Sequence, residues 1–249
     1  MPIGVAASPR RNGESAPGRG IGDRSLFLSR LLPSLTQGVD EALSAAGTRR
    51  LFWSVIAGIV LYVLLDIIAQ SLPPHYSPIS DPESDLAVGP YGWIMAVNFV
   101  VRGTLSLAFL YALTKTVKAG RSFMIGTYLL GIWGVGAIVL AAFPADVPAA
   151  PMSLHGTIHF VDAAIAFVGG AFGELTLSLQ FGRVEALRAA RAWALAIAVF
   201  SVLALVLFVS TAGPLWGLVE RVFIGSVLLW LAAVSAHLAR TRFDNAQLP

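Results

Sequence analysis

Six long apolar segments restrict what this chain can fold into more than any other feature of its sequence. They lie at about residues 51–70, 90–114, 122–143, 156–181, 192–211 and 216–238. A helix of about 20 apolar residues spans the hydrocarbon core of a bilayer, which is roughly 30 Å thick. Because lipid offers no partners to free backbone groups, such segments cross the membrane as helices. The chain is therefore predicted to be an all-α polytopic membrane protein with a six-transmembrane-helix bundle.

Composition supports this class and excludes several kinds of site. Charged residues make up 12% of the 249 residues, whereas a soluble domain contains about a quarter. The chain contains no cysteine. Disulfides, thiolate metal sites and covalently attached haem are therefore excluded.

The basic residues predict how the bundle is oriented in the membrane. Of the 17 Lys and Arg residues, seven precede the first segment, three lie between the second and third, three between the fourth and fifth, and two follow the sixth. The remaining two, Arg102 and Arg221, lie inside segments. By the positive-inside rule, both termini are cytoplasmic. We expect a multi-pass protein of the cell membrane, the inner membrane in a bacterium, and no nucleic-acid partner.

The chain outside the six segments is predicted to be of three kinds. Residues 1–24 are rich in Gly, Pro, Ser and Arg and are expected to form a disordered basic tail. Residues 25–50 carry spaced leucines and suggest an amphipathic juxtamembrane helix, interrupted at Pro33. The transmembrane domain covers residues 51–240, and residues 241–249 form a cytoplasmic C-terminal tail.

The stretch LHGTIHFVDA at residues 154–163 brings three ionisable side chains to the start of the fourth segment. They are His155, His159 and Asp162. Successive residues of an α-helix are rotated by about 100°, so these side chains fall within an arc of roughly 60°. The predicted topology places them near the outer face, together with His75 of the first outer loop and Asp146 of the second.

Further polar side chains lie in the outer half of other segments. Asp66 belongs to the first segment, Asn98 and Arg102 to the second, and Glu220 and Arg221 to the sixth. A charged group that faces hydrocarbon costs at least about 2.5 kcal/mol. We therefore expect Arg102 and Arg221 to pair with Asp66 and Asp162 inside the bundle. Glu174 lies too far along the fourth helix to join them, and we expect it to have a different partner.

Four short strings resemble the domain of unknown function 998 family of integral membrane proteins. They are SPISDPESDL in the first outer loop, FPAD after the third segment, the histidine-containing start of the fourth, and GLVER in the sixth. The resemblance covers about residues 51–240. It implies a bundle of six or a similar number of helices and no established reaction. It marks as family-type positions Asp81, Asp85, Arg102, Asp146, His155 and Arg221.

One functional hypothesis is a pocket that is open to the outer leaflet and binds a lipid headgroup or a small polar ligand. Arg102 and Arg221 suit a phosphate or a carboxylate, since guanidinium presents several donors at once. Asp66, Asn98 and Asp162 would complete the ligand-binding set. Prolines could stiffen the first outer loop as a cover. Partners are then membrane lipids or a small ligand from the outer face, and the oligomeric state is open.

A zinc-dependent hydrolase of lipid amides or esters is the main alternative. His155 and His159 have the i, i+4 spacing that lets two imidazoles reach one ion, and His75 is a third candidate ligand. The general base would be one of three carboxylates, namely Asp162, Asp146 or Asp81. The arrangement is similar in outline to alkaline ceramidases and adiponectin receptors. However, those proteins carry the histidine pair on their last helix.

The remaining alternative is that the polar side chains only hold the helices together. Two glycine-rich strings, at residues 131–136 and 169–173, also have a structural interpretation. They lie inside apolar segments and follow no strand, so they do not predict a phosphate-binding loop. Close packing of helices through small residues explains them instead.

Overall fold

A computed structural model of the chain describes residues 21–73, 75–117, 120–147, 150–211 and 213–241, and describes side chains from residue 44 onward. Within these ranges the chain is entirely helical, with no strand. Short one-turn helices, η1 (Glu83–Ala87), η2 (Phe181–Arg183) and α5 (Glu185–Arg188), lie in the connections. The long helices are α1 (Ile21–Gln70), α2 (Gly92–Thr116), α3 (Arg121–Ala142), α4 (Leu154–Gln180), α6 (Arg191–Ser210) and α7 (Trp216–Arg240).

The six predicted membrane spans are confirmed. Six helical stretches of the described chain are long and apolar enough to cross a bilayer: Ser44–Gln70, Gly92–Thr116, Arg121–Ala142, Leu154–Arg183, Arg191–Ser210 and Trp216–Arg240. Each contains one of the apolar segments of the sequence or overlaps nearly all of it. The protein is therefore a multi-pass membrane protein.

The predicted break at Pro33 is wrong, because α1 continues through this residue. A proline inside a helix lacks one backbone N–H, and its ring crowds the carbonyl four residues earlier. The helix accommodates both effects here. Leucines on both sides of Pro33 favour the helix. The helix also includes residues 21–24, which were predicted to belong to the disordered tail, while residues 1–20 and 242–249 lie outside the described part. The described chain divides into two compact units, with the boundary between Leu43 and Ser44.

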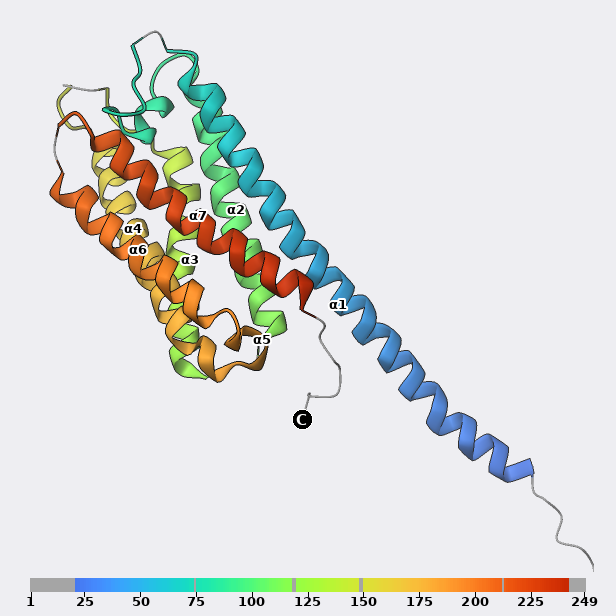
Figure 1. Cartoon of the computed structure of the whole chain (residues 1–249). Helices are drawn as coiled ribbons and strands as arrows, with labels where there is room; N and C mark the ends of the chain where they lie inside the picture. Colours follow the sequence, from blue (N-terminus) through green and yellow to red (C-terminus); the bar gives the residue numbers. More distant parts are fainter. Residues whose placement is uncertain (1–20, 74, 118–119, 148–149, 212, 242–249) are drawn as a thin grey trace, which may run out of the picture. The chain divides into compact units, whose positions relative to one another are not determined.

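The helices of the second unit pack mainly against their neighbours in the sequence. The most extensive contact joins α3 and α4, followed by α2 with α3, α6 with α7, and α4 with α6. Figure 1 shows α6 and α7 side by side. The part of α1 that begins at Ser44 is much less buried than α7. In the most apolar 18 residues of each span, 17% of this part of α1 is buried, against 61% of α7.

Glycines let α3 and α4 approach each other closely, as the two glycine-rich strings indicate. A Cβ on Gly173 would lie 2.6 Å from the backbone nitrogen of Leu130. A Cβ on Gly169 would lie 2.7 Å from the backbone oxygen of Leu129. Backbones in such contact gain van der Waals energy that larger side chains would prevent. The interpretation of these strings as helix-packing surfaces is confirmed.

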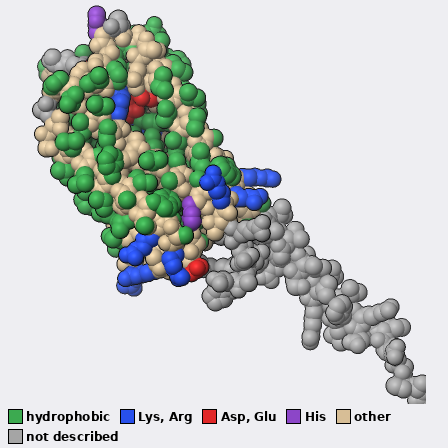
Figure 2. All heavy atoms as spheres, in the orientation of Figure 1, with side chains coloured by type: hydrophobic (Ala, Val, Ile, Leu, Met, Phe, Trp, Pro, Cys, Tyr) green, Lys and Arg blue, Asp and Glu red, His purple; other side chains and the backbone are tan. Residues whose placement is uncertain are grey.

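The two ends of the bundle differ in charge. The basic end contains the first residues of the Ser44–Gln70 span and carries Arg50, Lys115, Arg121, Arg183 and Arg240. The acidic end contains the opposite helix ends and the loops that carry Asp81, Glu83, Asp85 and Asp146. Figure 2 shows basic side chains gathered at the lower end of the bundle, and acidic and basic side chains visible together between apolar ones in the upper half.

We predict that Gly173→Ala lowers stability by about 1–3 kcal/mol, because overpacking forces the α3 backbone to shift. The temperature of unfolding of the detergent-purified chain, followed by circular dichroism, measures this effect. Gly225→Ala is the matched control, because a Cβ at Gly225 meets nothing within 4 Å. Equal unfolding temperatures for the two variants would contradict the packing role of Gly173.

Candidate functional site

The first loop at the acidic end, residues 71–91, packs against helix ends and is part of the folded core. Its short helix η1 contacts α2 and α7, and Leu86 within it is buried. The backbone N–H of Leu218 in α7 donates to the carbonyl of Ile79, at 2.9 Å. A Cβ at Gly217 would collide with the backbone of Asp81. The loop therefore covers the ends of α2 and α7.

Arg221 fastens this loop to α7. Its Nη1 donates to the carbonyl oxygens of Pro78 and Asp81, both at 3.1 Å, and to that of Gly217 at 3.2 Å. Its Nη2 donates to the hydroxyl of Tyr76. One guanidinium thus satisfies carbonyls from the loop and from its own helix, which makes Arg221 a loop anchor.

Tyr76 continues this network within the loop. Its hydroxyl group lies within hydrogen-bond distance of the carbonyls of Asp81 and Pro82, at 3.2 and 3.1 Å. Burial raises the pKa of this hydroxyl above its usual value. The hydroxyl therefore stays protonated and able to donate to these carbonyls at neutral pH.

Arg102 is the most deeply buried charge of α2, with 1% of its surface exposed. Its Nη1 lies 3.7 Å from Oε2 of Glu83, so the two side chains form an ion pair. Its Cζ lies 4.6 Å from the ring centre of Trp133, 5.2 Å from that of Phe99 and 5.9 Å from that of Tyr62. Aromatic rings at these distances stabilise a guanidinium through cation–π attraction.

Glu83 connects the loop, α1, α2 and α7. Its Oε1 accepts a hydrogen bond from the hydroxyl of Tyr62 in α1. Its backbone N–H donates to Oε2 of Glu220 in α7, at 2.5 Å. Together with the ion pair to Arg102, these bonds bring three helices to one residue of a loop.

The predicted partners of the two arginines are wrong. In the described chain, Arg102 pairs with Glu83 and not with Asp66 or Asp162, and Arg221 binds carbonyls and Tyr76. Asp66 still lies close enough to Arg221, and Asp162 to Arg102, for their charges to interact. The difference arises because the loop folds inward and supplies Glu83 at the shortest distance.

We call these neighbouring side chains the Arg102 cluster. Seven of the ten buried side-chain atoms that have no hydrogen-bond partner in the described chain belong to it. Such atoms are rare in folded proteins, and each requires a partner such as water, an ion or a ligand. The cluster consists of Tyr62, Asp66, Glu83, Asn98, Arg102, Trp133, Asp162, Glu220 and Arg221.

Carboxyl groups outnumber cations in the Arg102 cluster. Four acidic side chains (Asp66, Glu83, Asp162 and Glu220) face two arginines. A buried excess of like charges is unfavourable. The excess is removed if carboxyl groups bind protons, or if the cluster binds a cationic group.

The three histidines that were predicted to hold zinc are not brought together. His159 is buried, and its Nδ1 lies 2.8 Å from the carbonyl of Phe143. His155 is exposed and packs edge-on against the Phe143 ring, and His75 is exposed in the first loop. No group of three His, Asp or Glu side chains in the described residues has a geometry that suits a metal. The zinc hydrolase hypothesis has no support from this arrangement.

Two of the three candidate general bases have structural partners. Asp81 accepts hydrogen bonds from the N–H of Ser77 and the hydroxyl of Ser80, both at 2.8 Å. Asp146 accepts from the hydroxyl and the N–H of Ser153, at 2.6 and 2.8 Å. The bonds from Ser153 lower the pKa of Asp146 and keep it ionised. Both carboxylates therefore order loops.

Asp162 differs from these two carboxylates, because its Oδ2 is buried and has no partner in the described chain. It lies against Gly136 of α3, where a Cβ would be 3.2 Å from Oδ2. Gly136 thus leaves room for the carboxyl group in the helix interface. Asp162 remains a candidate functional group of the Arg102 cluster.

Glu174 lies apart from the cluster, as expected. It is completely buried, and neither carboxyl oxygen has a hydrogen-bond partner in the described chain. Its polar neighbour is Ser201 of α6, whose hydroxyl donates to the Ile197 carbonyl.

Sequence reasoning did not identify Glu83 and Tyr76 as members of the site. Both lie in a loop that also carries exposed polar residues, so local composition does not distinguish them. Glu220 adjoins Arg221 in the GLVER string. An acidic residue within a membrane span is expected to face the bundle interior, and Glu220 is buried there.

We predict that Arg102→Met lowers the free energy of unfolding on the order of 3 kcal/mol, because Glu83 loses its buried partner. Denaturant unfolding of the detergent-purified chain, followed by tryptophan fluorescence, measures this change. Arg240→Met is the control, since Arg240 is exposed and lies 6.0 Å from the ring centre of Trp53. Its loss should cost less than about 1 kcal/mol. Similar losses in both variants would refute the central role of Arg102.

Comparison with known proteins agrees with this architecture. The family model described as "Protein of unknown function (DUF998)" matches residues 56–237, which include four of the six spans completely, more than half of the other two, and the Arg102 cluster. No curated protein and no solved structure matched the chain. The match confirms the resemblance seen in the short strings of the loops and of α7. The chain belongs to the domain of unknown function 998 family.

Proposed function

We propose that this membrane protein binds a lipid headgroup or a small polar ligand at the Arg102 cluster, and that the ligand carries a cationic amino group. The observation that carries the proposal is the concentration, around Arg102, of buried polar atoms that have no hydrogen-bond partner within the described residues. A site that only held helices together would satisfy its own donors and acceptors more completely.

The charge of the cluster decides which ligand it favours. Arg221 is occupied by three carbonyls and Tyr76, and Arg102 is paired with Glu83. A purely anionic ligand would have to compete with these partners and would add to the excess of negative charge. An ammonium group offers three donors to Asp66, Asp162 and Glu220 and reduces that excess by one charge.

The accessible parts of the cluster lie on α1, α4 and α7. Asp66, Asp162 and Arg221 are half-buried, whereas Arg102 and Glu83 are almost completely buried. The low burial of the α1 span means that few contacts hold it against the bundle. A ligand that moves laterally out of the bilayer would therefore reach the cluster beside α1, where the least packing energy opposes it.

The orientation of the cluster is part of the proposal. The basic end of the bundle faces the cytoplasm of the cell membrane by the positive-inside rule. The Arg102 cluster then faces the opposite side. The ligand would come from the outer leaflet or from the extracytoplasmic solution.

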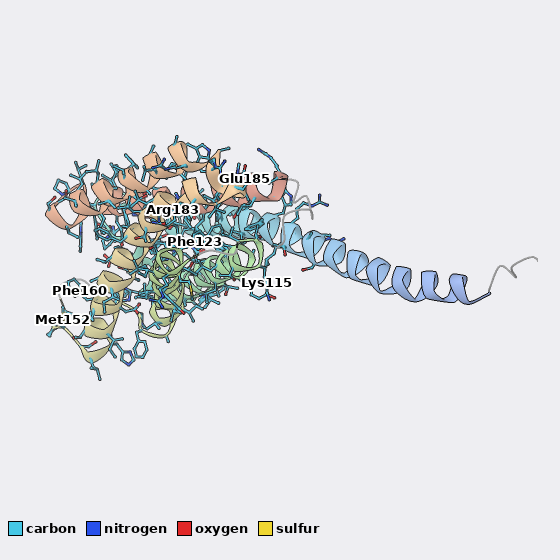
Figure 3. The ribbon with its side chains drawn as sticks, turned by 90° about the horizontal axis from the view of Figure 1, so that it is seen from below. Lys115, Phe123, Met152, Phe160, Arg183 and Glu185 are labelled. Carbon is cyan, nitrogen blue, oxygen red and sulfur yellow. The ribbon has the colours of Figure 1, made fainter. Side chains whose placement is uncertain are left out.

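Because the chain has no cysteine, single cysteines can test this orientation. In Figure 3, Met152 and Phe160 lie toward one end of the bundle, and Lys115 and Glu185 lie toward the other. Met152→Cys should react with a membrane-impermeant maleimide in intact cells, whereas Glu185→Cys should react only after permeabilisation. Both sites are well exposed, at 69% for Met152 and 69% for the Glu185 side chain. The reverse pattern would place the cluster in the cytoplasmic half.

Ligand class can be tested with lipids of defined headgroup. Short-chain phosphatidylethanolamine, titrated into the detergent-purified chain and followed by native mass spectrometry, should bind more tightly than phosphatidylglycerol at this site. Asp162→Asn should weaken the binding of phosphatidylethanolamine roughly tenfold, which is the effect of one lost charge-assisted hydrogen bond.

Asp85→Asn is the matched control, because it removes one carboxyl group from the acidic end outside the cluster. Burial raises the pKa of Asp85 to about 6, and the nearby charge of Asp81 makes a smaller contribution in the same direction. This carboxyl group is therefore ionised at pH 7.5. The control should bind phosphatidylethanolamine as the wild type does. If Asp162→Asn has no effect, or if both variants lose affinity equally, the cluster is a structural element and the proposal fails.

A further inference from the structure

A second feature, at the basic end, is a groove between the beginning of the α1 span and the end of α2. Its volume is about 490 Å³, within the range of about 300–1,000 Å³ that is usual for ligand sites. Gly47 contributes to its wall, and a Cβ there would meet nothing within 4 Å. We call this feature the basic groove; its polar lining consists of Ser44, Thr48, Arg50, Ser54, Tyr111 and Lys115.

Two cations supply the donors of the basic groove, one from each helix. Arg50 and Lys115 are both exposed, and neither forms an ion pair with an acidic side chain of the described residues. The Nζ of Lys115 lies 5.4 Å from the ring centre of Tyr111, one turn earlier on α2. Two unneutralised cations facing one cavity favour a doubly held anionic group such as phosphate.

Hydroxyl groups of α1 supply the acceptors. Thr48 Oγ1 donates to the carbonyl of Ser44 at 2.9 Å, and Ser54 Oγ donates to the carbonyl of Arg50 at 3.1 Å. Because both hydroxyl hydrogens are used within the helix, the oxygens present lone pairs to the groove. A ligand with hydroxyl groups of its own can donate to these oxygens.

The position of the groove indicates that its ligand is a lipid. Its residues belong to the first turns of the Ser44–Gln70 span and the last turns of the Gly92–Thr116 span, which is the level of phospholipid headgroups. Leu51 lines it, and Leu61, which is 46% exposed, lies about three turns further along α1 on the side of Arg50. Acyl chains would lie against these residues while the headgroup fills the groove.

We propose that the basic groove binds an anionic phospholipid whose headgroup carries hydroxyl groups, such as phosphatidylglycerol. The phosphate lies between Arg50 and Lys115, and the glycerol hydroxyls donate to Thr48 and Ser54. Basic sites between helices on the cytoplasmic side of membranes recognise anionic headgroups by this electrostatic attraction. The site is separate from the Arg102 cluster, at the opposite end of the bundle, and favours the opposite ligand charge.

Native mass spectrometry of the detergent-purified full chain tests the proposal, with phosphatidylglycerol and phosphatidylcholine of equal chain length as probes. The wild type should bind phosphatidylglycerol more tightly. Arg50→Gln/Lys115→Gln should reduce that affinity roughly tenfold or more, since each lost cation weakens attraction to an anionic headgroup. Both residues are exposed, so the double variant should keep the unfolding temperature of the wild type.

Arg49→Gln/Arg188→Gln is the matched control, because it removes two exposed cations from the same end without changing the groove lining. It should bind phosphatidylglycerol as the wild type does. Equal losses in both double variants would show general attraction to the basic end and overturn the proposal. Equal affinity for the two lipids would also overturn the proposal. Displacement of phosphatidylglycerol by sn-glycerol 3-phosphate at equal concentration would overturn it too, because it would identify a soluble phosphate ester as the ligand. Phosphatidylethanolamine binding at the Arg102 cluster should be unaffected by either double variant, so the two proposals fail separately.

Discussion

The burial of the Arg102 guanidinium is the constraint on which the acidic half of the molecule depends. A charge at this depth is tolerated in a membrane bundle when partners surround it. Here the partners are the carboxylate of Glu83 and the rings of Tyr62, Phe99 and Trp133. They come from α1, α2, α3 and the first loop. One side chain thus requires that four parts of the chain meet.

The first loop is consequently part of the core and not a solvated connection. Glu83 has to reach inward to Arg102, and this brings the loop backbone against the start of α7. Arg221 then binds three carbonyls, two of the loop and one of α7, and so fastens the loop to the helix. Glycine at position 217 allows this approach because it has no Cβ. The loop, the ion pair and α7 stabilise one another.

The span of α1 connects the two sites that we propose. It contributes Tyr62 and Asp66 to the Arg102 cluster and Arg50 to the basic groove. It is also the least enclosed of the six spans. Carboxyl groups are in excess at one end of this helix and cations at the other, so the two ends favour ligands of opposite charge.

The sequence by itself determined the six spans, the ends of the bundle that carry basic residues, and the close packing of helices at the two glycine-rich strings. Apolar length, cation counts and glycine spacing are local properties, and each acts within one helix or between sequence neighbours. Only the tertiary structure decided that Glu83 pairs with Arg102, that the histidines stay apart and that a groove opens beside Arg50. These features depend on the path of a loop and on how tightly α1 packs. Both depend on many weak contacts between parts of the chain that are distant in the sequence. The spacing of residues along the chain does not predict the sum of such contacts.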